Sequence, residues 1–552
     1  MIETVEVIIN NKKHNYNKDT SLLEIAQDFQ DQFEYPIILA RVGNRLKELS
    51  STITEPCEIE FLDLTSREGN NTHVNGLIYV MVYAVKKLYG KNANIIVEHS
   101  LDKGVFIEST FKLNEEKVKE IKKQMQEIIK QDKPIIKMNI DRMEAKKYFE
   151  SVGDYPKAGV MRYNTNNYVT LYRLGNLYNY FYHLMPTSTG LLEAFDLTYI
   201  KDNGFILRFP TIFIHDKIKK YEHHEKMFEV YKQYRDWGKA VNITTSVDLN
   251  RVVSLGKADD MIKIESAVQD HRILTVAKEI FDKKDDIKIV LIAGPSSSGK
   301  TTSSKKLCMY LQTFGLIPKV IGMDDFFKER VDNPKNPDGS YDYECLEALD
   351  LELFDKDIAE LLKGKKVLLP TYNFTFGKKE YNQTMTLADN EILVIEGIHA
   401  LDNKILTNIP RNKKYKIYIS PLTTLNVDDH NRISTTDNRL LRRIIRDNRT
   451  RGHTVDDTLA AWQSVRNGEE LYVFPYQDDS DVIINSATGY EMGVLKTYVE
   501  PLLYSVETDS PYYEEAKRLI DFLRVFLPIP SDAIPEDAIL REFIGGSYFV
   551  KD

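Results

Sequence analysis

The sequence predicts a multidomain α/β and α+β protein whose C-terminal part contains a parallel β-sheet flanked by helices. The chain has 552 residues, which is too long for one hydrophobic core and corresponds to about three to four domains. Short β-branched runs alternate with helical segments between residues 286 and 505, and a glycine-rich loop separates the first run from the helix after it. Strands that alternate with helices indicate a parallel sheet covered on both faces.

The glycine-rich loop is Gly294–Thr301, with the sequence GPSSSGKT, and it matches the pattern G-x-x-x-x-G-K-[ST]. The apolar run 287–293 before it predicts a buried strand, and residues 302–314 predict a helix that ends at Gly315. In this context backbone N–H groups wrap a phosphate chain, while the lysine reaches the β and γ oxygens and the hydroxyl binds Mg²⁺. The alternative, a chance Gly/Ser loop, is disfavoured by the strand and helix on either side.

Composition limits the classes of protein to which the chain can belong. The formal charge of −9 argues against a general nucleic-acid coat but not against a local basic patch. The three cysteines, Cys57, Cys308 and Cys345, are far apart, which excludes a disulfide scaffold and fits a reduced compartment. The N-terminus lacks a secretory signal pattern, and no apolar stretch approaches a membrane span. We therefore expect a cytoplasmic protein.

Two acidic positions follow predicted strands. Asp324 and Asp325 come after the strand expected at 319–323, and Glu396 ends the strand expected at 391–395. Ligands bind at the carboxyl ends of parallel strands, so these acids are expected to face the phosphates. We assign Asp324 to the chemistry and Asp325 to helix capping, and Glu396 to the Mg²⁺ site; an ordinary strand-to-loop glutamate is the alternative for Glu396.

Six arginines lie between residues 439 and 452. Arg439, Arg442, Arg443 and Arg446 are three or four residues apart, so they share one side of a helix. Arginine forks stabilise charge on a transferring phosphoryl group, which predicts a lid over the phosphates. A solvated helix face and a nucleic-acid patch are the alternatives.

With these residues the C-terminal domain resembles the uridine kinase/phosphoribulokinase family of P-loop kinases over roughly residues 287–485. The matching pieces are Gly294–Thr302, Met323–Phe327, Tyr341–Tyr343, Pro370–Phe374, Ile395–Gly397 and Arg442–Asp447.

The resemblance implies an ATP- and Mg²⁺-dependent kinase that phosphorylates the 5′-hydroxyl of a nucleoside, uridine or cytidine first of all. Catalysis would fall to Asp324 as general base together with Lys300, Arg443 and Arg446, and Mg²⁺ to Thr301, Asp324 and Glu396. The implied ATP-binding residues are Gly294, Pro295, Ser296, Ser297, Ser298, Gly299, Lys300, Thr301, Thr302, Arg446 and Arg451. The implied substrate-binding residues are Asp324, Phe327, Asp342, Tyr372 and Arg443, with Asp342 on the ribose hydroxyls and Tyr372 near the nucleobase.

The sequence departs from uridine-cytidine kinases at positions that help to read the pyrimidine. Phe327 stands where the family has tyrosine, Gly377 where it has histidine, and Ala461 where it has glutamine, although Gln463 is near. A kinase of the same fold acting on another hydroxyl, such as a sugar phosphate or a pantothenate-like acceptor, therefore remains an alternative.

The first 240 residues resemble the front of threonyl-tRNA synthetases. Residues 1–65 resemble the TGS domain, a ubiquitin-like β-grasp module, with strands expected at 4–9, 37–42 and 57–62 and a helix at 22–32. Residues 66–240 resemble the second additional domain of those synthetases. The editing chemistry is expected to be lost, because Leu77 stands where the second histidine after His73 should be and no cysteine lies between Cys57 and Cys308.

A zinc site from His73, His183, His223 and His224 lacks tight ligand spacing, so scattered surface histidines are the favoured interpretation. Residues 241–285 are expected to form a helical connector, 286–505 the kinase-like domain, and 506–552 a helical tail whose end has no role that the sequence assigns. A third hypothesis is an RNA- or tRNA-binding regulator that uses residues 1–240. We also expect a homo-oligomer that contacts no membrane.

Overall fold

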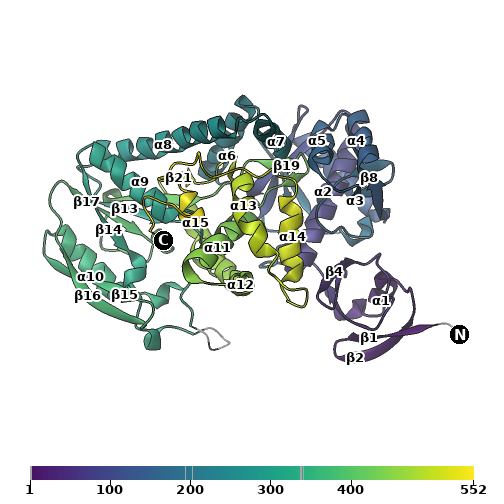
Figure 1. The fold of residues 1–552 in the computed structure, drawn as a ribbon, viewed down its shortest axis with the longest axis horizontal. Coiled ribbons are helices and arrows are strands. Elements are labelled where there is room, and N and C mark those ends of the chain that lie inside the picture. The colour runs from purple at the N-terminus through teal and green to yellow at the C-terminus, as the bar shows by residue number, and fades with distance from the viewer. Residues whose placement is uncertain (1–2, 193, 202, 336–338, 340, 552) are drawn as a thin grey trace.

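The computed structural model describes residues 3–192, 194–201, 203–335, 339 and 341–551. The N-terminal strands lie at one end of the elongated molecule and the parallel sheet lies toward the other (Figure 1). Among the described residues no helix is both long and apolar enough to cross a bilayer.

The N-terminal sheet has the strand order β2-β1-β5-β3-β4 and packs against one helix. β1 alternates exposed and buried residues, as a strand with one solvated face must. Ser21 caps the helix by accepting the N–H of Glu24. Two strands, β2 and β4, were not among the expected elements. The elements are β1 Thr4–Ile9, β2 Lys12–Asn17, α1 Leu22–Gln27, β3 Leu39–Val42, β4 Arg45–Glu48 and β5 Cys57–Leu62.

The next domain contains two antiparallel sheets, ordered β11-β12-β7-β6 and β10-β9-β8, with the long helix α2 buried among them. Its elements are α2 Arg67–Tyr89, β6 Ile95–Leu101, β7 Gly104–Ser109, α3 Glu115–Lys130, β8 Ile135–Asp141, α4 Arg142–Ser151, α5 Tyr155–Tyr163, β9 Tyr168–Leu174, β10 Leu177–Asn179, β11 Asp196–Ile200 and β12 Gly204–Arg208.

Three helices, α6 Glu225–Ala240, α7 Ser246–Ser254 and α8 Ala258–Asp282, connect this domain to the parallel sheet. They are packed elements rather than a loose linker. Phe228 and Tyr231 of α6 share one core with the sheet, and Ile273 and Val276 of α8 share the other.

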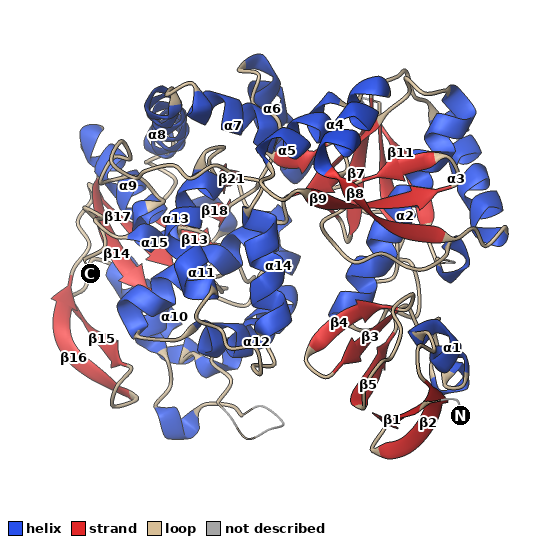
Figure 2. Ribbon diagram, turned by 45° about the vertical axis from the view of Figure 1, so that its right-hand side comes forward, coloured by secondary structure: helices blue, strands red, loops and turns tan. Residues whose placement is uncertain are grey.

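The C-terminal sheet has the order β14-β17-β13-β18-β21, and all neighbouring strands are parallel. Alternate residues of β13 face different cores: Val290 and Ile292 pack with α8 and α9, and Ile289 and Leu291 pack with α6 and α10. Helices therefore cover both faces of the sheet (Figure 2), as the alternation of strands and helices predicted. The elements are β13 Ile289–Ala293, α9 Lys300–Thr313, β14 Ile317–Gly322, α10 Leu351–Leu362, β17 Glu391–Glu396, β18 Lys414–Ser420, α11 Thr435–Arg451, α12 Val455–Tyr472, β21 Val482–Asn485 and α13 Glu491–Leu503.

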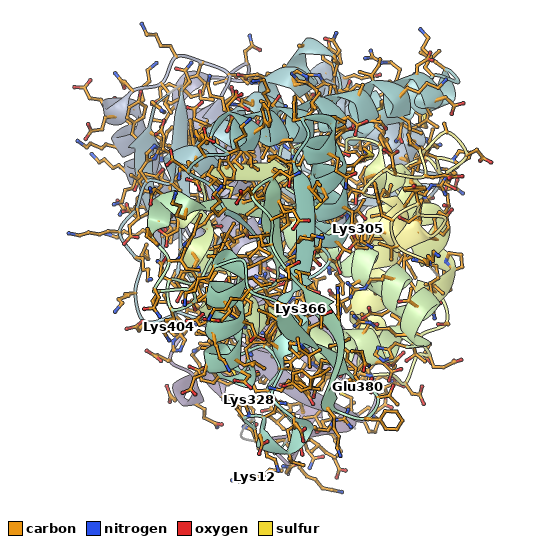
Figure 3. The ribbon with its side chains drawn as sticks, turned by 90° about the vertical axis from the view of Figure 1, so that its left-hand side faces the viewer. Lys12, Lys305, Lys328, Lys366, Glu380 and Lys404 are labelled. Carbon is orange, nitrogen blue, oxygen red and sulfur yellow. The ribbon has the colours of Figure 1, made fainter. Side chains whose placement is uncertain are left out.

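One expected strand of this sheet lies elsewhere. The run 366–369 belongs to β15 Val367–Asn373, which pairs antiparallel with β16 Lys378–Met385 in a separate two-stranded sheet. This hairpin stands apart from the parallel sheet in Figure 2, and Figure 3 labels Lys366 and Glu380 on it. The prediction was wrong because β16 is polar and mostly exposed, so no apolar pattern identified the partner strand.

A short hairpin, β19 Asn426–Asp428 and β20 Asn431–Arg432, ties the second domain to the kinase-like domain just before α11. Lys157 of α5 and Asp428 are both fully buried, with Nζ and Oδ1 3.1 Å apart. Val97 also donates its backbone N–H to the carbonyl of Asp429 at 2.7 Å.

The last residues return to the parallel sheet instead of extending away. α14 Tyr513–Leu523 packs on α13, and the short α15 Arg541–Ile544 packs on α11. The C-terminus lies beside these helices (Figure 1).

Candidate active site

The loop Gly294–Thr301 joins β13 to α9, as the sequence predicted. Gly294 lies so close to β18 that a Cβ atom there would meet the Ile419 carbonyl oxygen at 2.0 Å. Gly299 has φ +82° and Ser297 has φ +59°. These left-handed conformations turn the chain sharply and bring successive backbone N–H groups toward the start of α9.

Lys300 folds back over this loop. Its Nζ donates to the carbonyl oxygens of Gly294 at 2.9 Å and Pro295 at 3.1 Å. Burial lowers the pKa of Lys300, and the nearby carboxylates Glu396, Glu542 and Asp324 oppose that shift. The ammonium is thus held at the edge where phosphate oxygens would arrive.

The two predicted metal ligands Thr301 and Glu396 are in contact. The Thr301 hydroxyl donates to Glu396 Oε1 at 2.8 Å. Desolvation raises the pKa of Glu396, while Lys300 and the Thr301 hydrogen bond lower it. Asp324 is exposed, but desolvation by the groups around it raises its pKa, and Lys300 opposes the shift. Lys300, Glu396 and Asp324 therefore interact electrostatically at the carboxyl ends of β13, β17 and β14.

The predicted arginine lid divides into two groups with different surroundings. Arg439 forms a bidentate pair with Glu469, whose second contact is 2.7 Å, and Arg442 pairs in the same way with Glu491, whose second contact is 2.8 Å. Both guanidinium groups also donate to the phosphate loop, to the carbonyls of Ser296 and Ser297, each at 3.3 Å. Arg439 and Arg442 are buried supports of the loop and not lid residues, which corrects the prediction for these two.

The second group surrounds Asp447, which is fully buried. Its carboxylate contacts Arg443 at 3.1 Å, Arg446 at 2.8 Å and Arg451 at 3.4 Å. Arg443 also donates to the Ser296 hydroxyl at 2.9 Å. The single carboxylate of Asp447 thus binds three guanidinium groups. The positive charge that it does not neutralise is available to bind a phosphate.

The prediction that Asp325 caps a helix is wrong. The short 3₁₀ turn Met323–Phe326 is preceded by Gly322 and has no side-chain cap. Asp325 Oδ1 instead accepts the N–H of Tyr372 at 3.3 Å, because the β15–β16 hairpin packs against this turn. The contact joins the hairpin to the chain segment that carries Asp324.

Aromatic rings gather next to Asp324. Phe327 makes edge-to-face contacts with Tyr343 and Tyr372, with centroids 5.5 and 5.6 Å apart, and Tyr372 contacts Phe374 at 5.0 Å. The predicted residues Phe327 and Tyr372 are thus brought together, and both are buried.

Asp342, the predicted hydroxyl reader, is engaged in its own turn. Its Oδ1 accepts the N–H groups of Glu344 at 2.9 Å and Cys345 at 3.2 Å. The neighbouring Glu344 is the acid that sequence reasoning missed. Desolvation raises its pKa to about 7, and Glu469, Arg443, Lys300 and Asp324 all act on it. A second acid two residues beyond Asp342 was the only signal that could have identified it.

The positions that depart from uridine-cytidine kinases have other contacts. Gly377 has φ +66° in the β15–β16 turn, where a Cβ atom would lie 2.7 Å from Arg330 Cβ. Gln463 donates to Asn467 at 2.9 Å on the exposed face of α12. His399, which lies near Glu344, is buried against Tyr472, and burial lowers its pKa to about 4.

The four histidines weighed for zinc do not form a cluster. Among the described residues no group of three or more His, Cys, Asp or Glu side chains is gathered for a metal. His73 is buried inside α2 and not on the surface, which corrects the expectation, and burial lowers its pKa to about 4. His224 contacts Asp102 and Asp478, which raise its pKa to about 10.

The residues at the loop fit a nucleoside triphosphate with Mg²⁺. The Ser297 and Ser298 hydroxyls are buried and have no hydrogen-bond partner among the described residues. One hydroxyl and two carboxylates, from Thr301, Glu396 and Asp324, supply the oxygen ligands that Mg²⁺ prefers.

The chain is similar to known proteins over its C-terminal part. The phosphoribulokinase/uridine kinase family matches residues 289–491. Uridine-cytidine kinase A of Dictyostelium discoideum is 30% identical over 209 residues, which is 37% of this chain and 38% of that protein. The uridine kinase of Macrococcus caseolyticus is 26% identical over 218 residues, 39% of this chain and 97% of that protein. A solved structure from Silicibacter is 17% identical, covers 38% of this chain and 98% of its own, and has a TM-score of 0.28.

The chain thus spans well under half of the Dictyostelium relative but nearly all of the Macrococcus one. The matched segment contains β13, the phosphate loop, both acidic strand ends and α11. Residues 289–491 are therefore a P-loop kinase domain of the phosphoribulokinase/uridine kinase family.

Proposed function

We propose that this protein transfers a phosphoryl group from ATP to the 5′-hydroxyl of a nucleoside, with uridine and cytidine as the first candidates. The observation that carries the proposal is the convergence of Lys300, Glu396 and Asp324 at adjacent strand ends, next to the aromatic cluster of Phe327 and Tyr372. The names of the relatives over residues 289–491 support the same substrate class.

At the phosphate end the chain supplies position and charge. ATP would provide the transferable γ-phosphoryl group. The N–H groups of Ser298–Thr302 would hold its phosphates, while Thr301, Glu396 and Asp324 would hold Mg²⁺. Lys300 would exchange its two loop carbonyls for phosphate oxygens, because a charged partner binds an ammonium more strongly than a carbonyl does. Arg443, Arg446 and Arg451 would stabilise charge on the γ-phosphate oxygens.

At the acceptor end Asp324 would take the proton of the attacking hydroxyl. Its raised pKa makes it a better base than a solvated aspartate. Glu344 would accept hydrogen bonds from the neighbouring hydroxyls of the acceptor, because Asp342 already uses one oxygen within its turn. Phe327 and Tyr372 would flank a planar base.

The test is an acceptor panel. The full-length protein is incubated with Mg²⁺ and γ-labelled ATP together with uridine, cytidine, purine nucleosides, sugar phosphates and pantothenate, and labelled products are separated. We expect label on a pyrimidine nucleoside, with little on the others. Label on a sugar phosphate or pantothenate but on no nucleoside would contradict the nucleoside assignment and retain the kinase.

A second candidate, a kinase for another small hydroxyl compound, is favoured by one observation. The pyrimidine-reading positions are occupied by Phe327, Gly377 and Ala461, and the buried His399 introduces an imidazole near Glu344. An acceptor with an anionic or carbonyl group could bind that imidazole instead of the glutamine side chain that is absent at Ala461. The same panel separates the two candidates.

A further inference from the structure

The C-terminal segment Ala538–Phe549 lies directly on the phosphate loop, although it begins 47 residues beyond the end of the family match at 491. Within it Ile539, Glu542 and Phe543 are buried. Figure 1 places α15 and the C-terminus next to α11 and the parallel sheet. The sequence alone assigned this end no role.

Glu542 makes the contact that matters most. Its Oε2 accepts the backbone N–H of Thr302 at 3.0 Å. Thr302 is the third residue of α9, so its N–H is one of the helix-start donors that have no partner inside the helix. These are the donors that bind a phosphate chain at such a loop. A carboxylate from the far end of the chain therefore sits where a phosphate would bind.

Two apolar side chains of the segment cover the same loop. A Cβ atom on Gly299 would lie 2.4 Å from Ile539 Cγ2, so the isoleucine packs against the loop backbone. The ring of Phe543 lies 4.9 Å from the guanidinium of Arg442, which supports the loop from the other side. The segment thus contacts the loop through Glu542 and Ile539, and Phe543 packs on the arginine that supports the loop.

The segment is held by apolar packing and through its backbone carbonyls, and five of its residues belong to the hydrophobic core: Ala538, Ile539, Leu540, Phe543 and Ile544. Lys305 Nζ donates to the Phe549 carbonyl at 2.6 Å, and Arg449 donates to the carbonyls of Glu542 and Phe543 at 3.1 and 3.2 Å. Figure 3 labels Lys305 on the side where the pale yellow C-terminal ribbon lies. The backbone of the segment is therefore anchored in the core, and the side chain of Glu542 is the part that can leave the loop without breaking this packing.

We propose that Glu542 is a built-in substitute for a nucleotide phosphate, and that nucleotide binding at the phosphate loop displaces its carboxylate from the N–H of Thr302. This inference rests on the proposed use of ATP. The carboxylate of Glu542 and a nucleotide phosphate cannot both accept the single N–H of Thr302. Their negative charges would also repel each other at this position. Glu542 also lies close enough to act on the pKa values of Lys300 and Glu396. The carboxylate of Glu542 therefore competes with ATP and lowers the apparent affinity of the full-length protein.

The first experiment measures binding of a nonhydrolysable ATP analogue to the full-length protein by calorimetry. Glu542→Gln keeps the size of the side chain and removes its charge, and we expect the analogue to bind about tenfold more tightly. Glu536→Gln is the matched control, because Glu536 is an exposed carboxylate in the approach to the same segment, and it should leave the affinity unchanged. Weaker binding by Glu542→Gln would make Glu542 part of the site and overturn the proposal.

The second experiment needs no variant. Amide hydrogen exchange of the peptide 538–549 is followed in the wild-type protein with and without saturating analogue. We expect exchange in this peptide to become faster on binding, because it loses the contact between Glu542 and Thr302, while exchange at Gly294–Thr302 becomes slower. Protection of 538–549 that stays the same or increases would overturn the proposal, whereas failure of the analogue to bind the wild-type protein at all would instead contradict the proposed function.

Discussion

The phosphate end and the acceptor end of the site are built in different ways. The phosphate end consists of main-chain N–H groups fixed by glycines and by the buried pairs Arg439–Glu469 and Arg442–Glu491. The acceptor end consists of side chains on connecting segments, in which Phe327, Glu344 and Tyr372 come from three different stretches of chain.

This difference explains which properties vary most easily. A backbone cradle binds any polyphosphate and depends little on individual side chains other than its lysine and hydroxyl. An acceptor pocket made of side chains changes its specificity with each substitution. The departures from uridine-cytidine kinases, Phe327, Gly377 and Ala461, all lie outside the phosphate loop, which matches its sequence pattern completely.

The largest expected effect concerns Asp324, which would act both on Mg²⁺ at the phosphate end and on the hydroxyl at the acceptor end. Asp324→Asn should lower kcat about a thousandfold, because general-base assistance is worth roughly 10²–10⁴ in rate. The Kd for ATP should change less than about threefold, since asparagine still offers an oxygen to the metal. Steady-state kinetics and calorimetry measure the two quantities. Equal loss of turnover in Glu347→Gln, an exposed acid nearby, would show that the effect is not specific to Asp324.

The second prediction tests whether the buried arginines are supports. Arg439→Met leaves Glu469 without its bidentate partner and should lower the free energy of unfolding by about 3 kcal/mol, near the low end for a broken buried pair because Arg466 also reaches Glu469. Arg451→Met, at the half-exposed guanidinium on Asp447, should lower it by less than about 1 kcal/mol. Urea unfolding followed by intrinsic fluorescence compares the two. Similar values would remove the distinction between supports and lid.

The arginines also show what the sequence could predict. Helical spacing correctly placed Arg439, Arg442, Arg443 and Arg446 on one helix. Their roles depend on Glu469 and Glu491, which lie 30 and 49 residues further along the chain, and no local pattern indicates those pairings.

The strands show the same limit. β21 was predicted with its observed bounds, because a short apolar run buried on both faces has one stable position. β15 was assigned to the wrong sheet, since its partner β16 is polar, and Glu542 was missed because its contact with Thr302 spans 240 residues. The contiguous motif Gly294–Thr301 predicted the phosphate end. The pairing of β15 with β16 and the contact of Glu542 with Thr302 depend on partners that no local pattern identifies.

The third prediction concerns the acid that the sequence did not identify. Glu344→Gln should raise the acceptor KM about tenfold, roughly 1.4 kcal/mol, by removing a charged hydrogen-bond acceptor. The KM for ATP should stay within about twofold of wild type. Because the pKa of Glu344 is raised to about 7, its carboxylate becomes protonated as the pH falls from 8 to 6. The acceptor KM of the wild type should therefore rise over that interval.

A matched comparison isolates Glu344 from Asp324. Kinetics of Glu344→Gln at pH 6, 7 and 8 should show an acceptor KM that no longer changes with pH, while kcat changes with pH as it does in the wild type. A pH-dependent KM that survives in Glu344→Gln would assign the titration to another group and leave Asp342 as the hydroxyl reader.

The smallest expected effect is at Phe327, in the cluster of aromatic rings next to Asp324. Phe327→Tyr restores the residue of uridine-cytidine kinases and adds one hydroxyl beside Tyr343 and Tyr372. If a pyrimidine lies against this ring, the hydroxyl gains a hydrogen bond worth about 0.5–1 kcal/mol, and the KM for uridine should fall two- to fivefold. The KM for ATP should not change, because Phe327 packs with Tyr343, Tyr372 and Phe374 and is not part of the phosphate loop. Phe374→Tyr, at the exposed edge of the same cluster, is the control that adds a hydroxyl in water. An unchanged uridine KM in Phe327→Tyr would place the base elsewhere and favour an acceptor without a pyrimidine.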